Sequence, residues 1–212
     1  MKKFELTDEF VTNVFGHKLF RIKALVAFGD VEKGELGGFI EKEDNLSHDD
    51  NAWVYGNAQV SGNAWVSGNA QVSGNAQVSG NAQVFGNAQV FGNAQVFDNA
   101  WVSGNAQVFG NAQVFGNAQV SGNAQVFGNA DYAVVAGFGR YFRTTTFFRC
   151  KDKILRVQCG CFYGDLAQFR EIVKKTHGDS KYAKEYLAIA DLMELHFSDK
   201  CGGEQMNDGK IY

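Results

Sequence analysis

Residues 51–68 read NAWVYGNAQVSGNAWVSG, three copies of a six-residue unit that continues without insertion to Gly128 and gives thirteen copies in all. In each unit an Ala and a Val lie two positions apart, so in an extended segment both side chains point to one face. The Gln or Trp and the Ser, Phe or Tyr point to the other face. The Gly and Asn that follow tolerate the backbone torsions of a sharp turn. The pattern therefore predicts one short strand with an inward Val, and one corner, in every six residues.

A short fixed period indicates a solenoid, because a single unit cannot bury its apolar side without its neighbours. Three units per turn give a triangular coil of eighteen residues, and thirteen units give just over four coils. Asp98 replaces the corner Gly in one unit with another residue that tolerates turns. At about 4.8 Å per coil, the regular part is predicted to be about 20 Å tall.

This pattern resembles the left-handed parallel β-helix built from hexapeptide repeats, in which an aliphatic residue follows a small residue two positions earlier. The resemblance covers residues 51–128 and is the only basis for the left-handed sense. The sequence departs from that family after the aliphatic position, where seven units carry Phe or Tyr. We expect a mainly β chain, a three-sided parallel β-helix of hexapeptide repeats at residues 51–130.

The two ends of the chain are predicted to close the solenoid, whose open ends would expose unpaired strand edges and core. Residues 1–50 are expected to form an N-terminal β cap, because β-prone runs at 10–15 and 18–28 flank the turn residues Gly16 and His17. Counting back in sixes from the first repeat predicts an irregular first coil that begins near Phe39.

Residues 131–212 are expected to form a small C-terminal α/β domain of ββαα type. Its strands are predicted at 141–149 and 154–161, joined by a charged turn. Asp165 and Gln168 have the spacing of a capping box and open an amphipathic helix that ends at His177 and Gly178. A second helix is expected at about 180–197.

Charge is absent from the middle of the chain, where Asp98 is the only charged residue between 51 and 130. Such a surface gives no electrostatic reason to bind phosphate backbones, which argues against a nucleic-acid partner. No apolar run is long enough to span a membrane, and the acidic start of the chain is not typical of a signal peptide. We therefore expect no membrane partner, a cytoplasmic location and reduced cysteines.

The repeats are preceded by GELGGFIEKEDNLS at 34–47 and followed by YFRTTTFFR at 141–149 and CGCFYGDLAQFREIVKKTHG at 159–178. Taken together, these segments resemble proteins carried by phages and prophages. The resemblance covers nearly the whole chain. It implies a mobile-element origin and a cytoplasmic setting, and it supplies no residue roles.

Enzymes built on the hexapeptide β-helix are acyltransferases and one class of carbonic anhydrase, and a resemblance to either would require histidines in or between the coils. Residues 51–128 contain no His, Cys, Glu, Lys or Arg. General acid-base catalysis and zinc binding both need such groups. We expect no catalytic residues and no cofactor there, and we expect His17 and His48 to be structural or exposed.

Two weaker patterns lie in the last third of the chain. Cys159 and Cys161 would share one face of a strand, and a zinc site could be completed by Cys150 with His177, His196 or Cys201, although buried thiols explain the same pattern without a metal. We therefore expect no metal site. Six basic residues could dock an anion, an acidic partner or nucleic acid, or simply form a solvated strand face. They are Arg140, Arg143, Arg149, Lys151, Lys153 and Arg156.

Aromatic side chains are predicted to stack on the outside of the solenoid, because each face recurs every eighteen residues. One face aligns Tyr55, Ser73, Phe91, Phe109 and Phe127, the second aligns Ser61, Ser79, Phe97 and Phe115, and the third carries Phe85 with Trp65 and Trp101 beside it. Exposed aromatic area of this extent is typical of interaction sites, although a ladder that merely stiffens the solenoid is the alternative.

The sequence favours a non-enzymatic protein-interaction module from a phage or prophage. It would be a rigid rod that presents aromatic ladders and inhibits a host or defence protein. A structural or virion-associated protein is one alternative, and an enzyme or ligand-sequestering protein with its site in the C-terminal domain is another. The uncharged sides of the rod also predict a homo-oligomer, either a dimer or a trimer.

Overall fold

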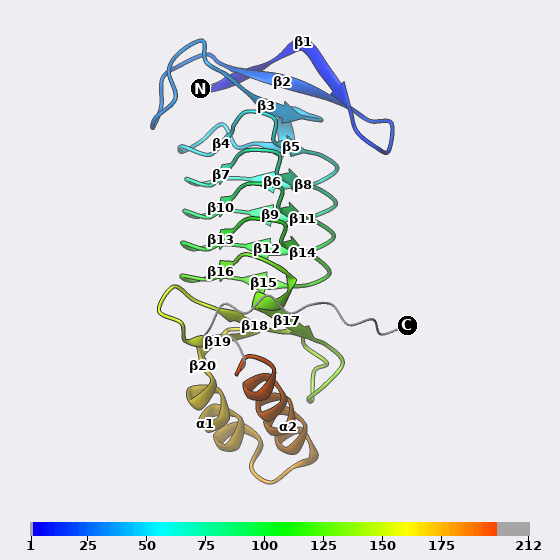
Figure 1. Ribbon diagram of the computed structural model, residues 1–212, viewed down its shortest axis with the longest axis vertical. Helices are drawn as coiled ribbons and strands as arrows, with labels where there is room; N and C mark the ends of the chain where they lie inside the picture. Colours follow the sequence, from blue (N-terminus) through cyan, green and yellow to red (C-terminus); the bar gives the residue numbers. More distant parts are fainter. Residues whose placement is uncertain (1, 199–212) are drawn as a thin grey trace, which may run out of the picture.

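A computed structural model describes residues 2–198 as a column of stacked coils (Figure 1). Three N-terminal strands close one end of the column, and a sheet with two helices lies at the other end. The fold is a mainly β, three-sided parallel β-solenoid, as the repeat predicts. Among the described residues, no helix is long and apolar enough to cross a membrane.

Thirteen strands of two residues each build the coils, one from every sequence repeat. They are β4 (Trp53–Val54), β5 (Gln59–Val60), β6 (Trp65–Val66), β7 (Gln71–Val72), β8 (Gln77–Val78), β9 (Gln83–Val84), β10 (Gln89–Val90), β11 (Gln95–Val96), β12 (Trp101–Val102), β13 (Gln107–Val108), β14 (Gln113–Val114), β15 (Gln119–Val120) and β16 (Gln125–Val126). Every third strand pairs in parallel, so the strands form three sheets. The orders are β4-β7-β10-β13-β16, β5-β8-β11-β14 and β6-β9-β12-β15.

The eighteen-residue coil is confirmed by the register of these sheets. Gln89 pairs with Gln71 on one side and with Gln107 on the other, each eighteen residues away. Backbone hydrogen bonds join the same neighbouring coils, as where the Phe91 N–H donates to the Val108 carbonyl, seventeen residues further on, at 3.0 Å. Each coil therefore satisfies the backbone groups of the next.

The inside of the solenoid is made of the Ala and Val of each repeat, whose side chains are at most 1% exposed. Eleven corners carry Gly with φ between +61° and +74° and a twelfth carries Asp98 with φ +59°, which confirms the predicted turn chemistry, whereas Gly128 after the last strand is extended with φ −157°. At these corners Asn side chains of successive coils donate to one another over 3.0–3.4 Å, as in the ladder that runs from Asn51 to Asn123.

The N-terminal cap is an antiparallel sheet that continues into the solenoid. It consists of β1 (Phe4–Thr12), β2 (Lys18–Ala24) and β3 (Leu36–Ile40). The predicted hairpin is present, although β1 starts six residues earlier than the run at 10–15 because a bulge between Leu6 and Phe10 lets the strand continue. The strand β3 pairs antiparallel with β2 and parallel with β5, through Phe39 and Gln59. The irregular first coil therefore begins where the sequence predicts it.

Cap residues cover the open core of the first coil. Trp53 occupies an outward repeat position, yet it is fully buried because Phe4 and Phe28 pack edge-on against its ring at 6.2 and 5.3 Å. The 3-10 helix η1 (Glu43–Asn45) holds Asn45, whose amide donates to the Ala64 carbonyl at 2.8 Å. The N-terminal segment is thus bonded directly to the coils.

The C-terminal sheet has four antiparallel strands, and the prediction of two was incomplete. They are β17 (Tyr132–Val135), β18 (Thr145–Arg149), β19 (Leu155–Cys159) and β20 (Phe162–Asp165), with the 3-10 helix η2 (Asn129–Asp131) before them. The strand expected from residue 141 begins only at Thr145, because Gly137, Gly139 and Phe142 adopt positive φ. The sequence of β20 contains Gly164 and Asp165, residue types that are depleted in strands.

Both predicted helices are present. The helix α1 (Leu166–His177) begins at the capping box of Asp165 and Gln168 and ends at Gly178, which has φ +54°. The helix α2 (Lys181–His196) has Ser180 as its N-cap.

The strand β18 joins the solenoid to the helices, because its neighbouring side chains point to opposite faces. Phe148 belongs to the core of the solenoid, while Phe147 packs edge-on against Phe169 of α1 at 6.1 Å. Thr146 accepts a hydrogen bond from the Gln119 N–H at 3.0 Å, and the Tyr132 hydroxyl donates to the Gln113 carbonyl at 2.6 Å. The sheet therefore closes the last coil on one face and holds the helices on the other.

The inward and outward assignment predicts losses of stability of very different size for two neighbouring residues. Val90→Asp places an unpaired charge in a fully buried column, which costs several kcal/mol. The variant should therefore lose the cooperative melting transition that the wild type shows. Gln89→Asp, on the outer surface, loses one amide of a ladder and should cost about 1 kcal/mol. Circular dichroism melts of the two variants check this, and equal losses would contradict the assignment.

A second prediction concerns Lys3, which is 3% exposed and donates to the Ala52 carbonyl at 2.9 Å. Burial lowers the pKa of Lys3 from 10.5 to about 8, although Asp50 and Asp49 oppose the shift. Between these two values the unfolded chain binds more protons than the folded chain, so folding stability attributable to Lys3 rises with pH by up to about 1.4 kcal/mol per pH unit.

Chemical denaturation of the wild type and of Lys3→Met should be compared from pH 7.5 to pH 10. The variant loses the hydrogen bonds of Lys3 at every pH. As pH rises, the wild type should become more stable relative to the variant, because the cost of burying the ammonium disappears. A difference that is constant over this range would show that the ammonium is not destabilised by burial.

Candidate functional site

Two stacks of phenylalanines lie on the outer surface of the solenoid. The long ladder is Phe91, Phe109 and Phe127 on the sheet of β10, β13 and β16, and the short ladder is Phe97 and Phe115 on the sheet of β11 and β14. Ring planes are 11° apart within Phe91–Phe109 and Phe97–Phe115, with centroids at 4.8 and 5.3 Å. The outermost rings, Phe115 and Phe127, are 47% and 59% exposed.

Tyr55 stands apart from the long ladder, although it shares its column. Ser73 separates it from Phe91, and its ring packs against the N-terminal part of the core. Burial raises the pKa of Tyr55, and the nearby carboxylates of Asp30 and Glu35 act in the same direction.

Beside the long ladder, the outward amides of four strands form a second ladder, in which Gln107 donates to Gln89 at 2.9 Å. Its members are Gln71, Gln89, Gln107 and Gln125. The long ladder therefore borders an uncharged polar stripe.

The turn between β1 and β2, residues 13–17, reaches down beside the coils, and we call it the arm (Figure 1). The Asn13 side chain builds it by accepting from the N–H groups of Phe15 and His17 at 3.0 and 2.9 Å. Gly16 has φ +83°, which completes the tight turn. Two apolar side chains remain in solvent at its tip, since Val14 is 92% and Phe15 is 79% exposed.

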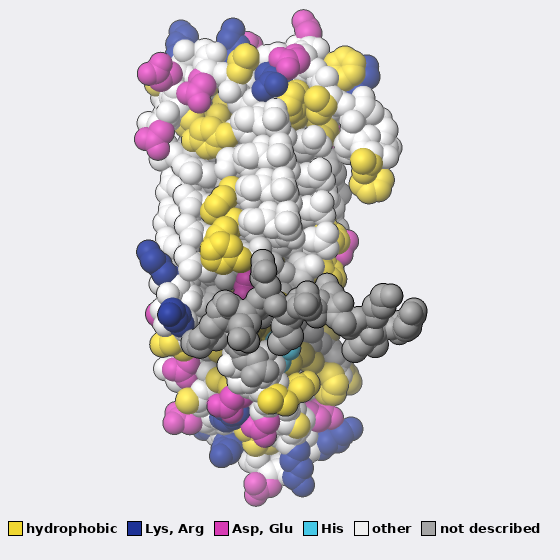
Figure 2. Space-filling view, in the orientation of Figure 1, with side chains coloured by type: hydrophobic (Ala, Val, Ile, Leu, Met, Phe, Trp, Pro, Cys, Tyr) yellow, Lys and Arg dark blue, Asp and Glu magenta, His cyan; other side chains and the backbone are white. Residues whose placement is uncertain are grey.

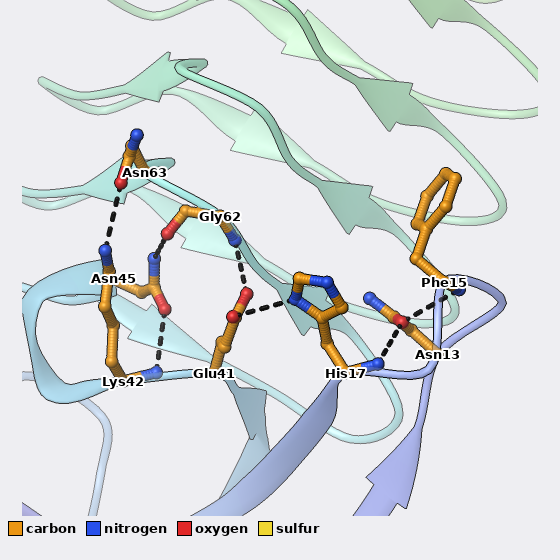
Figure 3. Close-up of polar contacts among 8 residues, drawn as sticks. All are labelled: Asn13, Phe15, His17, Glu41, Lys42, Asn45, Gly62 and Asn63. Atoms are coloured by element: carbon orange, nitrogen blue, oxygen red, sulfur yellow. Dashed lines mark hydrogen bonds and ion pairs between the residues drawn. The ribbon is translucent and has the colours of Figure 1, made fainter.

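A single carboxylate fastens the arm to the first coil (Figure 3). One oxygen of Glu41 accepts from His17 at 2.9 Å, and the other accepts from the Gly62 N–H at 2.7 Å. The Gly62 hydrogen bond, helped by His17, lowers the pKa of Glu41 below its ordinary value. Figure 3 shows Phe15 extending away from this pair. Glu41 is therefore an anchor of the arm, with both oxygens already engaged.

Between the arm and the solenoid lies a groove of about 620 Å³. Its far wall is formed by Ser61, Ser79 and Phe97, which belong to three successive coils, and its near wall by Val14 and Phe15. Asp98 also lines the groove. We call this space the arm groove.

Asp98 occupies a corner at which the other twelve repeats have Gly. It adopts φ +59°, in the left-handed region where L-residues other than Gly, Asn and Asp are strained, and its carboxylate accepts from the Gly116 N–H at 3.1 Å. The sequence placed Asp98 in a turn but gave no reason to connect it with the arm. The available signal for this site was the apolar pair Val14-Phe15 directly before the predicted turn at Gly16 and His17.

The third side of the solenoid carries Trp65 and Trp101, which are 44% and 42% exposed. Phe85 packs edge-on against Trp101 at 6.2 Å. On the face shown in Figure 2, charged side chains gather toward the two ends of the molecule, and the sides of the coils are largely free of them.

The six basic residues of the C-terminal region do not form one surface. Arg149 donates to the Phe197 carbonyl, and Arg156 forms an ion pair with Asp152 at 2.7 Å. Arg140 and Arg143 instead place their guanidinium groups over the ring of Tyr141, at 5.6 and 5.2 Å. Arg149 and Arg156 are thus used within the chain, whereas Arg140 and Arg143 form no ion pair within residues 2–198.

The structure contradicts the zinc arrangement considered from the sequence. Cys150 precedes the turn between β18 and β19 and is buried beside Ala124, whereas Cys159 pairs with Thr145 at the opposite end of the two strands. Cys161 lies in the turn after β19 and not on its face. No three His, Cys, Asp or Glu side chains within residues 2–198 are placed to hold a metal ion. Cys201 lies outside the described residues.

The repeats match the family model described as YdcK beta solenoid repeat in six overlapping windows, at residues 58–74, 70–86, 76–92, 88–104, 94–110 and 106–122. A comparison with curated proteins finds no match. The matched windows include the coils that carry Ser61, Ser79 and Phe97, and they include neither the arm nor the C-terminal sheet and helices. The chain is a β-solenoid repeat protein whose repeats are similar to that family's.

Proposed function

We propose that the protein is a non-enzymatic protein-interaction module that holds an extended segment of a partner protein in the arm groove. One observation carries this proposal: the exposed side chains of Val14 and Phe15 line the same groove of about 620 Å³ as Phe97 of the solenoid. A space of this size bounded by apolar side chains and a few polar groups is typical of binding sites.

The shape of the groove favours an extended segment. Its wall of Ser61, Ser79 and Phe97 crosses three coils, a length of about 10 Å at the spacing of adjacent strands. Backbone groups of these coils already bond to the coils above and below, so side chains must make the contacts.

The chemistry of the groove favours apolar residues with a cation among them. Phe97 and Phe15 offer apolar contact, and Asp98 offers a carboxylate that no ion pair within residues 2–198 uses. Glu41 adds a second negative charge, partly offset by His17. A segment that carries Lys or Arg between Leu or Phe residues is complementary to this arrangement.

A binding role also accounts for the chemistry of the site better than catalysis does. Both oxygens of Glu41 are occupied, and Asp98 is the only titratable group that the coils contribute to the lining of the groove, beside amides and hydroxyls. General acid-base chemistry needs a group that is free to exchange a proton with its substrate.

The resemblance to phage and prophage proteins supports a cytoplasmic setting in a host cell. In that setting the partner is a host or defence protein, and occupation of the groove by one of its segments inhibits it. A structural or virion-associated role is the alternative, and it would need the sides of the rod to contact other copies of the chain.

The groove can be tested with the synthetic peptide acetyl-Leu-Lys-Phe-Lys-Leu-amide, labelled with fluorescein and followed by anisotropy. Asp98→Gly restores the residue of the other twelve repeats and should weaken binding roughly fivefold, the effect of losing one exposed ion pair. Phe97→Ser copies Ser61 and Ser79 of the same column and should weaken it further. Added salt should weaken wild-type binding more than that of Asp98→Gly.

Phe85→Ser is the matched control, because Phe85 lies on another side of the solenoid in a column that also contains Ser67 and Ser103. It should leave peptide binding unchanged. The proposal would be overturned by equal binding of a peptide with Glu in place of both Lys, by equal effects of the Phe85 and Phe97 variants, or by no binding at millimolar peptide.

We further propose that the long ladder joins copies of the chain into a dimer or trimer. Phe127 is 59% exposed, and the Gln stripe beside the ladder carries no charge that would keep two copies apart. A closed assembly repeats one contact by symmetry, so a substitution alters every copy of it.

Replacing Phe91, Phe109 and Phe127 together with Ser should preserve the fold, because the same column already contains Ser73. Analytical ultracentrifugation should then give a mass near the 23.3 kDa of one chain. A wild-type protein that is monomeric at high micromolar concentration would rule out this assembly.

A further inference from the structure

The C-terminal region contains a second hollow, at the opposite end of the molecule from the arm groove. It has a volume of about 210 Å³ and lies between the turn before β18, the end of β19 and the two helices. Its inner wall includes Phe169 and Tyr186, which are 2% and 6% exposed and pack edge-on at 5.8 Å. The interior is therefore aromatic.

Two positive charges stand at this hollow without a matching negative charge. Arg140 and Arg143 both line it, and both guanidinium groups lie over the Tyr141 ring, at 5.6 and 5.2 Å. Neither forms an ion pair with a carboxylate of residues 2–198. Two cations held on one ring repel each other, and an anion between them would remove that repulsion.

One acidic side chain near Tyr186, Glu185, is already occupied. Glu185 accepts from the Gly139 N–H at 3.0 Å and forms an ion pair with Lys181 at 3.4 Å. It therefore holds the turn that carries Arg140 in place, and it is not free to neutralise the two arginines. The guanidinium donors stay available for an oxyanion, which they match in geometry.

Further polar groups complete the lining. Burial raises the pKa of Tyr186, so its hydroxyl stays protonated at neutral pH and can donate a hydrogen bond. Cys159 accepts from the Thr145 hydroxyl at 3.2 Å, and the His177 ring stacks on Tyr186 at 5.9 Å. Such a lining offers polar groups that can orient a ligand beside the two arginines.

We propose that this hollow binds a small organic anion, with its carboxylate or phosphate between Arg140 and Arg143 and its apolar part against Phe169 and Tyr186. The volume is below the roughly 300–1,000 Å³ of sites for drug-sized ligands, so the ligand is a small molecule with one ring or a short chain. This site is independent of the arm groove, and neither proposal rests on the other.

The test uses phenyl phosphate and phenylacetate as probes, with benzyl alcohol as the uncharged control, titrated into the full-length protein and followed by amide NMR shifts. At least one anion should bind and shift residues around Cys159 and His177, and the stronger of the two identifies the anionic group. Arg143→Gln should weaken binding about tenfold, the effect of losing one charge-assisted hydrogen bond. Ile172→Trp, at a partly exposed position of the lining, should block the hollow while both arginines remain.

Lys184→Gln removes a positive charge from α2 outside the hollow and controls for the overall charge of this region. It should bind the probe like the wild type. The proposal is overturned if benzyl alcohol binds as well as the anions, if Lys184→Gln and Arg143→Gln weaken binding equally, or if neither anion binds at millimolar concentration.

Discussion

The solenoid depends on the backbone hydrogen bonds that join each coil of eighteen residues to the next. Because backbone groups make these bonds, as between Phe91 and Val108, the outward side chains are not needed to hold the coils together. Burial of Ala and Val fixes which way each strand faces, since a slip of one residue would turn the apolar side to solvent. The outward positions can therefore alternate between Ser and Phe without changing the fold, which frees them for contact with other molecules.

A stack held together in this way is stable only if its two ends are closed. At the first coil, β3 covers the open strand edge by pairing antiparallel with β2 and parallel with β5. The cap therefore extends one sheet of the solenoid. At the last coil β18 turns Phe148 into the solenoid and Phe147 toward the helices. Both proposed sites arise from these closures. The turn of the cap hairpin forms the arm, and the turn before β18 carries the two unpaired arginines.

The sequence predicts the coils well because their signal is local and is repeated thirteen times, so each unit supports the same interpretation. It predicts α1 equally well, since the capping box at Asp165 lies within one turn of helix. The arm groove could not be predicted, because it joins residues 13–17 to Phe97 through the anchor at Glu41, and no periodicity encodes that contact. The roles of the basic residues could not be predicted either, because their spacing along the chain does not reveal that Arg149 donates a hydrogen bond to the Phe197 carbonyl.

The number of coils sets the distance between the two ends of the molecule, which no single repeat determines. The arm groove ends at Phe97 and Asp98, whereas the long ladder continues to Phe127, next to the C-terminal sheet. Each coil adds about 4.8 Å along the axis and preserves the register of its neighbours. Gain or loss of one coil between Phe97 and the C-terminal sheet would therefore change the distance from the groove to the arginine hollow and leave the local geometry of each intact. The solenoid thus sets the distance between the two proposed sites, and its length is set by a unit that keeps the same register from coil to coil.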